Sequence, residues 1–494
     1  MKTIIRIRPL FFLLVALYGL SLNGCAGRME QPPVAPTRNV IKDYATATKA
    51  EYSYRLHKTI PGNGYTTHVL RMISGKWLTE QEVQETEWWH WVHVVVPDTL
   101  SSSTALLMIG GGKREESEPK DAPSSLRQIA LQTHSVVAHL HNVPNQPLNF
   151  VNDPYGRRSE DELIAYGWRK FLEAGGGEDQ VQWLARLPMT RAAVRAMDAI
   201  TDYTTQTLGR PVTRFVTAGG SKRGWTTWAT AIADERVAAI VPLVIDLLNL
   251  EPSFLHHWQA YGQWSSAVDD YVREGIMEWM GTLEFNQLLK YADPYSYHKQ
   301  LTLPKMVINA SGDEFFLPDS WQFYWQDLVG EKHLRYIPNT GHSLSKTDAE
   351  ETIAAFFESV VKQTPRPDFD WRVDRGALVI VTSPNQPPQS IKLWQATNDN
   401  ARDFRLPVLG KAYISTEVPL SSDGKYRITV TPPEKGWTAF FVELTYPGPG
   451  RTPFKFTTGV TVVPEQLPFP AFKPATPKGT PMPTQKTSGF QIKR

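Results

Sequence analysis

The strongest constraint on the fold of this chain is a serine between a strand pattern and a helix pattern. A β-type run, Arg214 to Ala218, leads into Gly219-Gly220-Ser221-Lys222-Arg223-Gly224, and a helical pattern follows from Trp225. Glycines permit the backbone dihedrals of such a corner, which holds the serine hydroxyl exposed above a sheet edge. The corner also directs the amide of Lys222 and the positive end of the helix dipole toward a developing oxyanion. It predicts a nucleophilic serine, although an ordinary βα turn is the alternative, because Arg223 stands where a small residue is usual.

An acid and a histidine follow the serine in the order that an α/β-hydrolase requires. A buried-strand pattern ends just before Asp313, and a second strand pattern, Leu334 to Ile337, precedes His342. In an open parallel sheet the loops after the strands lie along one edge, where ligands bind. We predict that Ser221 attacks a carbonyl carbon, His342 takes and returns its proton, and Asp313 fixes the imidazole tautomer. Asp319 is a rival acid, and Asp313 is favoured because it follows its strand directly.

A glycine-rich loop follows an early strand pattern. Ala105 to Ile109 ends in Gly110-Gly111-Gly112. Hydrolases of this fold take a second oxyanion donor from such a loop, so we expect Gly111 and Gly112 to form an oxyanion hole with Lys222. A flexible glycine turn is the alternative. Phosphate binding is disfavoured because the chain has no G-x-x-x-x-G-K-[ST] motif.

Length and composition are typical of a globular protein with more than one domain. The chain has 494 residues, of which 41% are hydrophobic and 21% charged, and this length exceeds what one core usually supports. The net charge of +2 and the lack of a basic stripe argue against a nucleic-acid partner. The 12 histidines and single cysteine show no zinc-site spacing and no H-E-x-x-H motif, so we expect no metal and no cofactor.

The start of the chain predicts an export signal. A basic beginning precedes an apolar run, Leu10 to Leu22, that is too short to be a comfortable membrane span. Cys25 follows Leu-Asn-Gly, which resembles a bacterial lipobox, so we expect a lipidated Cys25 that anchors the chain in a membrane. Ala26 is not the aspartate associated with inner-membrane retention, which favours the outer membrane, facing the periplasm or exported. A plain signal peptide with an incidental cysteine is the alternative.

Strand and helix patterns alternate as in βαβ units and then give way to short alternating strands. We therefore expect an α/β class fold: a doubly wound, mostly parallel α/β-hydrolase sheet with a helical lid insertion, followed by a β-sandwich. In the lid, aromatic and histidine side chains are expected to line a substrate pocket, with packing of the lid on the body as the alternative: His256, His257, Trp258 and Tyr261. The expected segments are a signal peptide at 1–24, a tether at 25–42, the hydrolase domain at 43–364 with its lid at 247–293, the sandwich at 365–465 and a disordered Pro-rich tail at 466–494.

Motifs in both domains resemble the PhoPQ-activated pathogenicity-related protein family, a group that includes eukaryotic autocrine proliferation repressor A proteins. They are the segments 160–166, 186–190, 219–227, 256–262, 312–320 and 401–405. The resemblance extends from about 43 to 464. It implies an α/β-hydrolase fold with a serine triad at Ser221, Asp313 and His342. The family name describes regulation and virulence and specifies no reaction.

The serine turn also resembles that of glucuronoyl esterases, whose pattern G-x-S-R-x-G has its small residue at the later position, as Gly224 does here. This resemblance implies that Lys222 contributes its side chain as well as its amide to the oxyanion hole. Uronate ester specificity does not carry over, because lysine offers a point charge where arginine offers a planar fork.

Together these patterns predict a cell-envelope serine hydrolase that is related to virulence or envelope stress. It would cleave an ester, or an amide or peptide bond, in a small molecule, peptide or glycan. Two alternatives stay open. One is a protein with a hydrolase fold that has lost catalytic activity and acts in binding or signalling. The other is a dipeptidyl-peptidase-like enzyme in which Glu160, Asp161 and Glu162 hold a substrate amino terminus, although their position at a helix start favours N-terminal capping.

Overall fold

The computed structural model of the chain describes residues 38–47 and 51–483. The predicted signal peptide and Cys25 lie outside these residues. Helix α1 (Val40–Thr46) begins inside the predicted tether, because Val40 and Ile41 are buried in the main core. In the part of the chain that the structure describes, no helix combines the length and apolarity needed to cross a bilayer.

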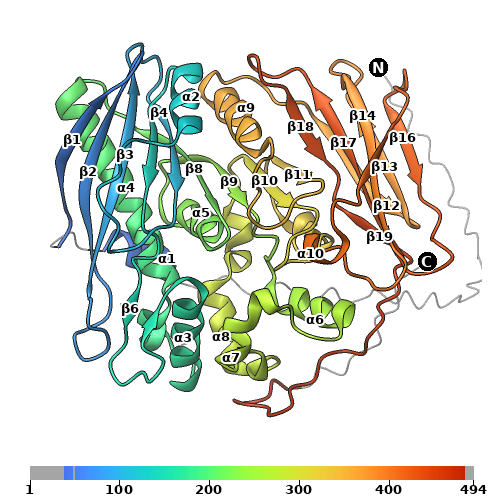
Figure 1. Cartoon of the computed structure of the whole chain (residues 1–494), viewed down its shortest axis with the longest axis horizontal. Helices are drawn as coiled ribbons and strands as arrows, with labels where there is room; N and C mark the ends of the chain where they lie inside the picture. The colour runs from blue at the N-terminus through green and yellow to red at the C-terminus, as the bar shows by residue number, and fades with distance from the viewer. Residues whose placement is uncertain (1–37, 48–50, 484–494) are drawn as a thin grey trace, which may run out of the picture. The chain divides into compact units, whose positions relative to one another are not determined.

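Within the described residues, nine strands form the large sheet, in the order β1-β2-β3-β5-β4-β8-β9-β10-β11 (Figure 1). Neighbours from β1 to β5 pair antiparallel, and those from β5 to β11 pair parallel. The parallel strands carry the apolar runs expected of strands buried on both faces. This is the predicted α/β-hydrolase sheet. Its strands are β1 (Ser53–Pro61), β2 (Tyr65–Lys76), β3 (Glu87–Pro97), β4 (Thr104–Ile109), β5 (Val137–Leu140), β8 (Arg214–Gly220), β9 (Val237–Leu243), β10 (Lys305–Ala310) and β11 (Lys332–Ile337).

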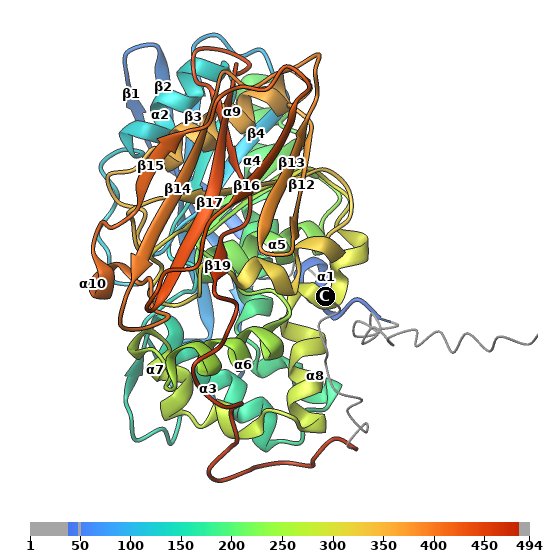
Figure 2. The ribbon, with the colours of Figure 1, turned by 90° about the vertical axis from the view of Figure 1, so that its right-hand side faces the viewer.

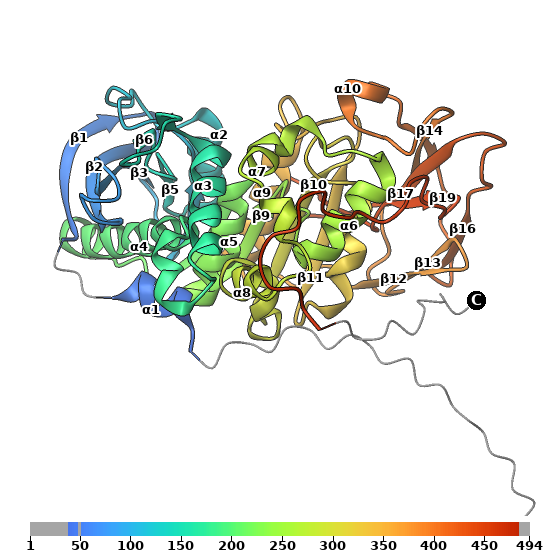
Figure 3. The same ribbon diagram turned by 90° about the horizontal axis from the view of Figure 1, so that it is seen from below.

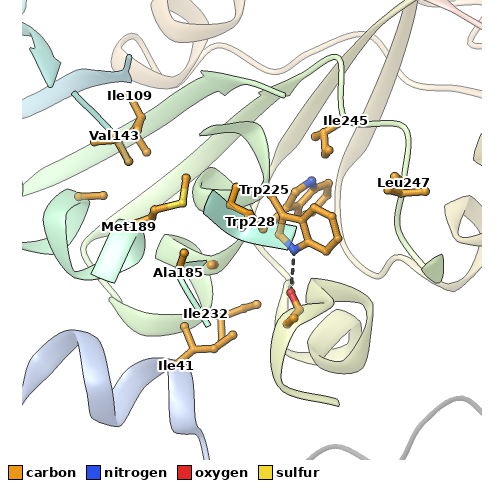
Figure 4. Packing of buried hydrophobic residues seen from close by; sticks show 14 of the residues in the cluster. Ile41, Ile109, Val143, Ala185, Met189, Trp225, Trp228, Ile232, Ile245 and Leu247 are labelled. Atoms are coloured by element: carbon orange, nitrogen blue, oxygen red, sulfur yellow. Dashed lines mark hydrogen bonds between the residues drawn. The ribbon is translucent and has the colours of Figure 1, made fainter. Parts of the chain in front are cut away.

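Helices cover both faces of this sheet (Figure 3). Helix α1, α4 (Arg186–Leu208) and α5 (Lys222–Ala233) contribute to one hydrophobic cluster, and α2 (Ser124–Thr133) and α9 (Ala349–Val361) contribute to the other. Figure 4 shows the first cluster around α5, where Trp225 and Trp228 are buried. The indole Nε1 of Trp225 donates a hydrogen bond of 2.8 Å to the carbonyl of Ala292, which ties α5 to the lid.

The predicted insertion after β9 is helical. It contains α6 (Leu250–Tyr261), α7 (Asp269–Arg273) and α8 (Leu283–Ala292). These helices lie with α3 (Glu160–Glu173) below the sheet in Figure 1. Helix α3 comes from a distant part of the hydrolase segment, and the sequence patterns did not place it beside the lid.

Antiparallel strands follow the hydrolase segment and form two sheets, as expected for a β-sandwich (Figure 2). The backbone amide of Tyr336, on the edge strand β11, donates to Thr457 Oγ1 at 2.9 Å, so the sandwich covers this edge of the large sheet. The first sheet contains β12 (Phe369–Asp374), β13 (Ala377–Thr382) and β16 (Lys425–Thr429), and the second contains β14 (Ser390–Asn398), β15 (Ile414–Glu417), β17 (Trp437–Tyr446), β18 (Phe454–Thr457) and β19 (Thr461–Val463).

The first part of the tail differs from the expectation of disorder. Residues 466–483 follow the lid as mostly irregular chain, and the Phe472 ring packs against Trp258 and Trp264 with centroid distances of 4.9 and 5.0 Å. The amide of Phe469 donates to the carbonyl of Gln259. The Pro- and Lys-rich composition gave no indication of these contacts, in which the Phe472 ring packs on lid aromatics and the Phe469 backbone bonds to the lid.

Candidate active site

Ser221 lies at the corner between β8 and α5 with a strained backbone. Its φ of 57° and ψ of −125° are rare for a residue with a side chain. A Cβ atom at Gly219 would lie 2.8 Å from the carbonyl oxygen of Arg223, and one at Gly224 would lie 2.9 Å from the carbonyl oxygen of Gly219. The corner therefore requires small residues at 219 and 224. Because the small residue after the serine is needed at 224, an arginine is tolerated at 223.

The ammonium of Lys222 is held by two acids of α3. Its Nζ lies 2.8 Å from Glu160 and 2.9 Å from Asp161, and Arg223 binds the other oxygen of Glu160 at 2.6 Å. Burial would raise the pKa of Glu160, but the charges of Arg223 and Lys222 outweigh it and lower the pKa to about 2. The structure thus differs from the expectation that the Lys222 side chain serves the oxyanion hole. Its backbone amide begins α5, where the first amides have no intrahelical acceptor.

The acids at the start of α3 do not share one role. Glu162 forms the predicted N-terminal cap, in a capping box with Ser159. Glu160 and Asp161 instead neutralise the cations that follow the serine. This pairing reaches between two segments that are far apart in the sequence, so a local pattern could not indicate it.

His342 and Asp313 form a hydrogen-bonded pair. Nδ1 of His342 lies 2.9 Å from Oδ2 of Asp313, whose side chain is only 4% exposed. The other oxygen, Oδ1, accepts the backbone amide of Phe315 at 2.8 Å and so keeps the carboxylate oriented. Glu314, which the sequence analysis missed, accepts the backbone amide of His342 at 2.7 Å and holds its loop. Nε2 of His342 is buried and forms no hydrogen bond with any of the described residues, so it forms none with Ser221.

Asp319, the rival acid, belongs to a different network. It accepts from Nε2 of His256 at 3.0 Å and from Arg402 at 2.5 Å. Burial would raise the pKa of Asp319, but the charges of Arg402 and His256 outweigh it and hold the pKa far below the usual range. Asp319 therefore ties the lid to the sandwich segment, and Asp313 is the acid beside His342.

The glycine loop after β4 lies against the serine corner. A Cβ at Gly111 would lie 2.8 Å from Nη2 of Arg223, and Gly112 has a φ of 137°, which a residue with a side chain would rarely adopt. The carbonyl of Gly111 accepts the amide of Asn142 at 2.7 Å. Among the described residues, the amides of Gly111 and Gly112 donate to no other protein group. Their role as oxyanion donors stays a prediction.

A small apolar cavity of about 30 Å³ lies beside Ser221. Phe315 and Phe316 line it, and their rings contact His342 with centroid distances of 4.2 and 5.9 Å. The guanidinium of Arg186, buried at the cavity, donates to the carbonyl of Lys222 at 2.8 Å. The complete lining is Asp161, Trp168, Arg186, Ser221, Lys222, Trp225, Ile245, Leu247, Leu250, Phe254, Val268, Tyr271, Phe315 and Phe316.

Comparison with known proteins assigns the family. Residues 41–405 match the PhoPQ-activated pathogenicity-related proteins. The chain belongs to this family. A curated relative, autocrine proliferation repressor protein A of Dictyostelium discoideum, is 36% identical over 456 residues, which cover 87% of this chain and 91% of the relative.

Solved structures resemble this PhoPQ-related chain at low identity. An acetyl xylan esterase from Paenibacillus sp. R4 is 14% identical and matches 67% of this chain and 97% of its own, with a TM-score of 0.46. Acetyl xylan esterase 1 from Thermoanaerobacterium sp. JW/SL YS485 is 12% identical and matches 68% of this chain and 96% of its own, with a TM-score of 0.41. Neither likeness specifies a reaction for this member of the family.

The four predicted substrate contacts of the lid do not line the cavity beside Ser221. His256 binds Asp319, and Nε2 of His257 accepts the backbone amide of Ser265 at 3.0 Å. Trp258 packs on Phe472 of the tail, and the Arg405 guanidinium lies 4.4 Å above the ring of Tyr261. His256, Trp258 and Tyr261 thus join the lid to other parts of the chain, and His257 bonds within the lid, which agrees with the alternative that these side chains serve packing.

A third acid, Asp246, is buried just after β9. It accepts a hydrogen bond of 2.7 Å from the hydroxyl of Tyr324 and another from the hydroxyl of Tyr336. Burial raises the pKa of Asp246 to about 8, although the two tyrosine hydrogen bonds act to lower it. The carboxyl is therefore mostly protonated in the folded protein at neutral pH.

Asp246 makes stability depend on pH. An unfolded aspartate ionises near pH 3.9, so between about pH 4 and pH 8 Asp246 holds a proton in the folded chain that it has lost in the unfolded chain. The contribution of this group to the free energy of unfolding should therefore fall as pH rises through this window, by at most about 1.4 kcal/mol per pH unit. We expect Asp246→Asn to weaken this decrease. Urea unfolding at pH 5 and pH 8 measures it, and identical pH dependence in both proteins would contradict the assignment.

Proposed function

We propose that this protein is a serine hydrolase that cleaves an ester bond. Ser221 would be the nucleophile, His342 the general base and acid, and Asp313 the residue that fixes the imidazole. The observation that carries the proposal is the strained Ser221 corner on a cavity whose wall, Phe315 and Phe316, contacts the His342 ring. Strain at a side-chain-bearing residue persists where function demands it, and a sharp strand-to-helix turn is how this fold exposes a nucleophile.

The reaction would follow the acyl-enzyme route. Ser221 Oγ attacks the ester carbon while its proton passes to Nε2 of His342, and the oxyanion binds the amide of Lys222 together with one from the glycine loop. The intermediate then collapses, His342 returns the proton to the leaving alcohol, and water repeats the sequence on the acyl-enzyme. Because Nε2 of His342 has no partner among the described residues, its hydrogen bond to Ser221 would form when substrate closes the site.

The size of the cavity favours a short acyl group. A volume of about 30 Å³ lined by indole and phenyl rings accommodates a methyl-sized group, and the guanidinium of the buried Arg186 lies 4.3 Å from the centre of the Trp225 ring. Amide or peptide cleavage would use the same side chains with a poorer leaving group. The dipeptidyl-peptidase alternative loses its support, because Glu160 and Asp161 bind Lys222.

Hydrolysis of a substrate panel tests the proposal. The panel comprises p-nitrophenyl esters of increasing acyl length, a uronate methyl ester and an N-terminal dipeptide amide, each measured against a Ser221→Ala blank. We expect turnover above the blank on short acyl esters, falling as the acyl chain outgrows the cavity. Turnover equal to the blank on every substrate would contradict the hydrolase proposal.

A binding or signalling role is the second candidate. The observation that favours it is the name of the Dictyostelium relative, a repressor of proliferation, at 36% identity. The paired His342 and Asp313 favour catalysis, since a scaffold that no longer turns over substrate has no need of an aligned imidazole. The panel above separates the two roles.

We also propose a lipid-anchored location in the cell envelope. The support is the sequence of residues 1–25, which lie outside the described part of the chain. The name of the family, PhoPQ-activated pathogenicity-related protein, favours an envelope-stress or virulence setting. Cys25→Ser should move the protein from the membrane fraction to the soluble fraction. Unchanged sedimentation with membranes would contradict the anchor.

A further inference from the structure

Three histidines, two on neighbouring strands of the large sheet and one just after the second strand, form a cluster outside the proposed catalytic residues. His93 on β3 pairs directly with His139 on β5, and His141 follows two positions later, so all three lie on the same face. One ring nitrogen of each lies within 4.8 Å of the others. The ring of His141 is 4.0 Å from that of His139 and 4.8 Å from that of His93.

The cluster leaves two buried ring nitrogens without partners. Within the described residues, Nε2 of His93 and Nδ1 of His139 form no hydrogen bond, although buried polar atoms are nearly always bonded. The one bond inside the cluster joins Nε2 of His141 and Nδ1 of His93 at 3.0 Å. An imidazole with the ordinary histidine pKa is mostly neutral at physiological pH. Neutral imidazole is the form that binds metal ions.

We propose that His93, His139 and His141 bind one zinc ion, with water as the fourth ligand. Three imidazoles with an open position are a known ligand set for Zn²⁺. Zn–N bonds near 2.1 Å place ligand nitrogens about 3.4 Å apart, so the rings need to approach by roughly 1 Å. His139 and His141 are only partly buried, which leaves an entry path for the ion and room for the water.

The ion would stabilise the start of the glycine loop, at Gly110. A Cβ at Gly110 would lie 2.2 Å from Nε2 of His139, so the loop packs directly on the cluster. The amide of Gly110 donates to the carbonyl of Leu140 at 2.7 Å, which binds the loop to the same strand. This site is separate from hydrolysis and does not rest on the proposed function. It departs from the sequence expectation of no metal, because β-strand pairing, and not sequence spacing, brings the ligands together.

Zinc binding by the full chain tests the proposal. The protein is purified without a polyhistidine tag, incubated with ZnCl₂, dialysed into metal-free buffer and assayed for zinc by mass spectrometry. We expect one zinc per chain. His139→Asn and His141→Asn should each weaken the zinc affinity by about 100-fold or more, since even the loss of an outer-shell partner costs 10- to 100-fold. The matched control is His134→Asn, an exposed residue with φ 48° at the end of α2, a conformation that asparagine adopts readily.

Two further measurements keep the result decisive. Co²⁺ should give the visible absorption of a tetrahedral site in the wild type and the His134 variant and lose it in the other two. Thermal unfolding without metal checks that the variants are folded. Less than a tenth of a zinc per wild-type chain at micromolar zinc would overturn the proposal. So would equal zinc binding by the folded His139 and His141 variants, because the ion would then lie elsewhere.

Discussion

Ser221→Ala is expected to lower kcat on the best short-chain ester by about 10⁶-fold, as removal of the nucleophile does in serine hydrolases. The alanine leaves the amides of Lys222 and the glycine loop in place, so a residual rate above that in water should remain. The same variant should lose labelling by a fluorophosphonate, which reacts with activated serines. Steady-state kinetics and intact-protein mass spectrometry measure the two effects.

Ser345→Ala is the control for this substitution. Ser345 is exposed and belongs to the loop after His342, so its loss removes a hydroxyl near the site and should leave kcat and labelling unchanged. Labelling of the Ser221 variant to the wild-type extent would show that a different serine is activated. The assignment of the nucleophile would then be wrong.

Asp313→Asn is expected to lower kcat by about 10⁴-fold with little change in KM. Nδ1 of His342 donates to the carboxylate, and an amide that presents its NH₂ group there would favour the wrong tautomer, the effect known for the triad aspartate of serine hydrolases. In the proposed reaction the carboxylate would also stabilise the imidazolium that forms as the proton leaves Ser221. Stopped assays over pH 6 to 9 on the purified variant measure the loss.

Asp319→Asn distinguishes the two acids. It removes the partner of the Arg402 guanidinium, which is only 4% exposed, and breaking such a buried pair typically costs about 3–5 kcal/mol of stability. We expect this variant to unfold at lower denaturant while its folded fraction keeps most of the turnover. A 10⁴-fold loss of kcat from Asp319→Asn with normal turnover in Asp313→Asn would reverse the assignment.

Local patterns predicted most of the fold. Apolar runs such as Met306 to Ala310 predicted strands buried on both faces, and the alternation of strands with long helical patterns predicted the parallel part of the sheet. The glycines around Ser221 predicted the strand-to-helix corner, because few backbone solutions connect those elements so tightly. The contacts of the tail could not be predicted locally, because the Phe472 ring packs on Trp258 and the Phe469 amide bonds to Gln259, both on a helix far away in the sequence.

The sequence by itself determined the class of fold, the strained serine corner and the chain order of serine, acid and histidine, because periodicity and glycine placement are local properties. Only the tertiary structure decided which acid faces His342, what holds the Lys222 ammonium and which histidines gather. Each of those pairings joins residues that come together through sheet order and helix packing. Charge, hydrogen bonding and metal coordination act over a few ångströms in space, and the chain positions of the partners do not encode those distances.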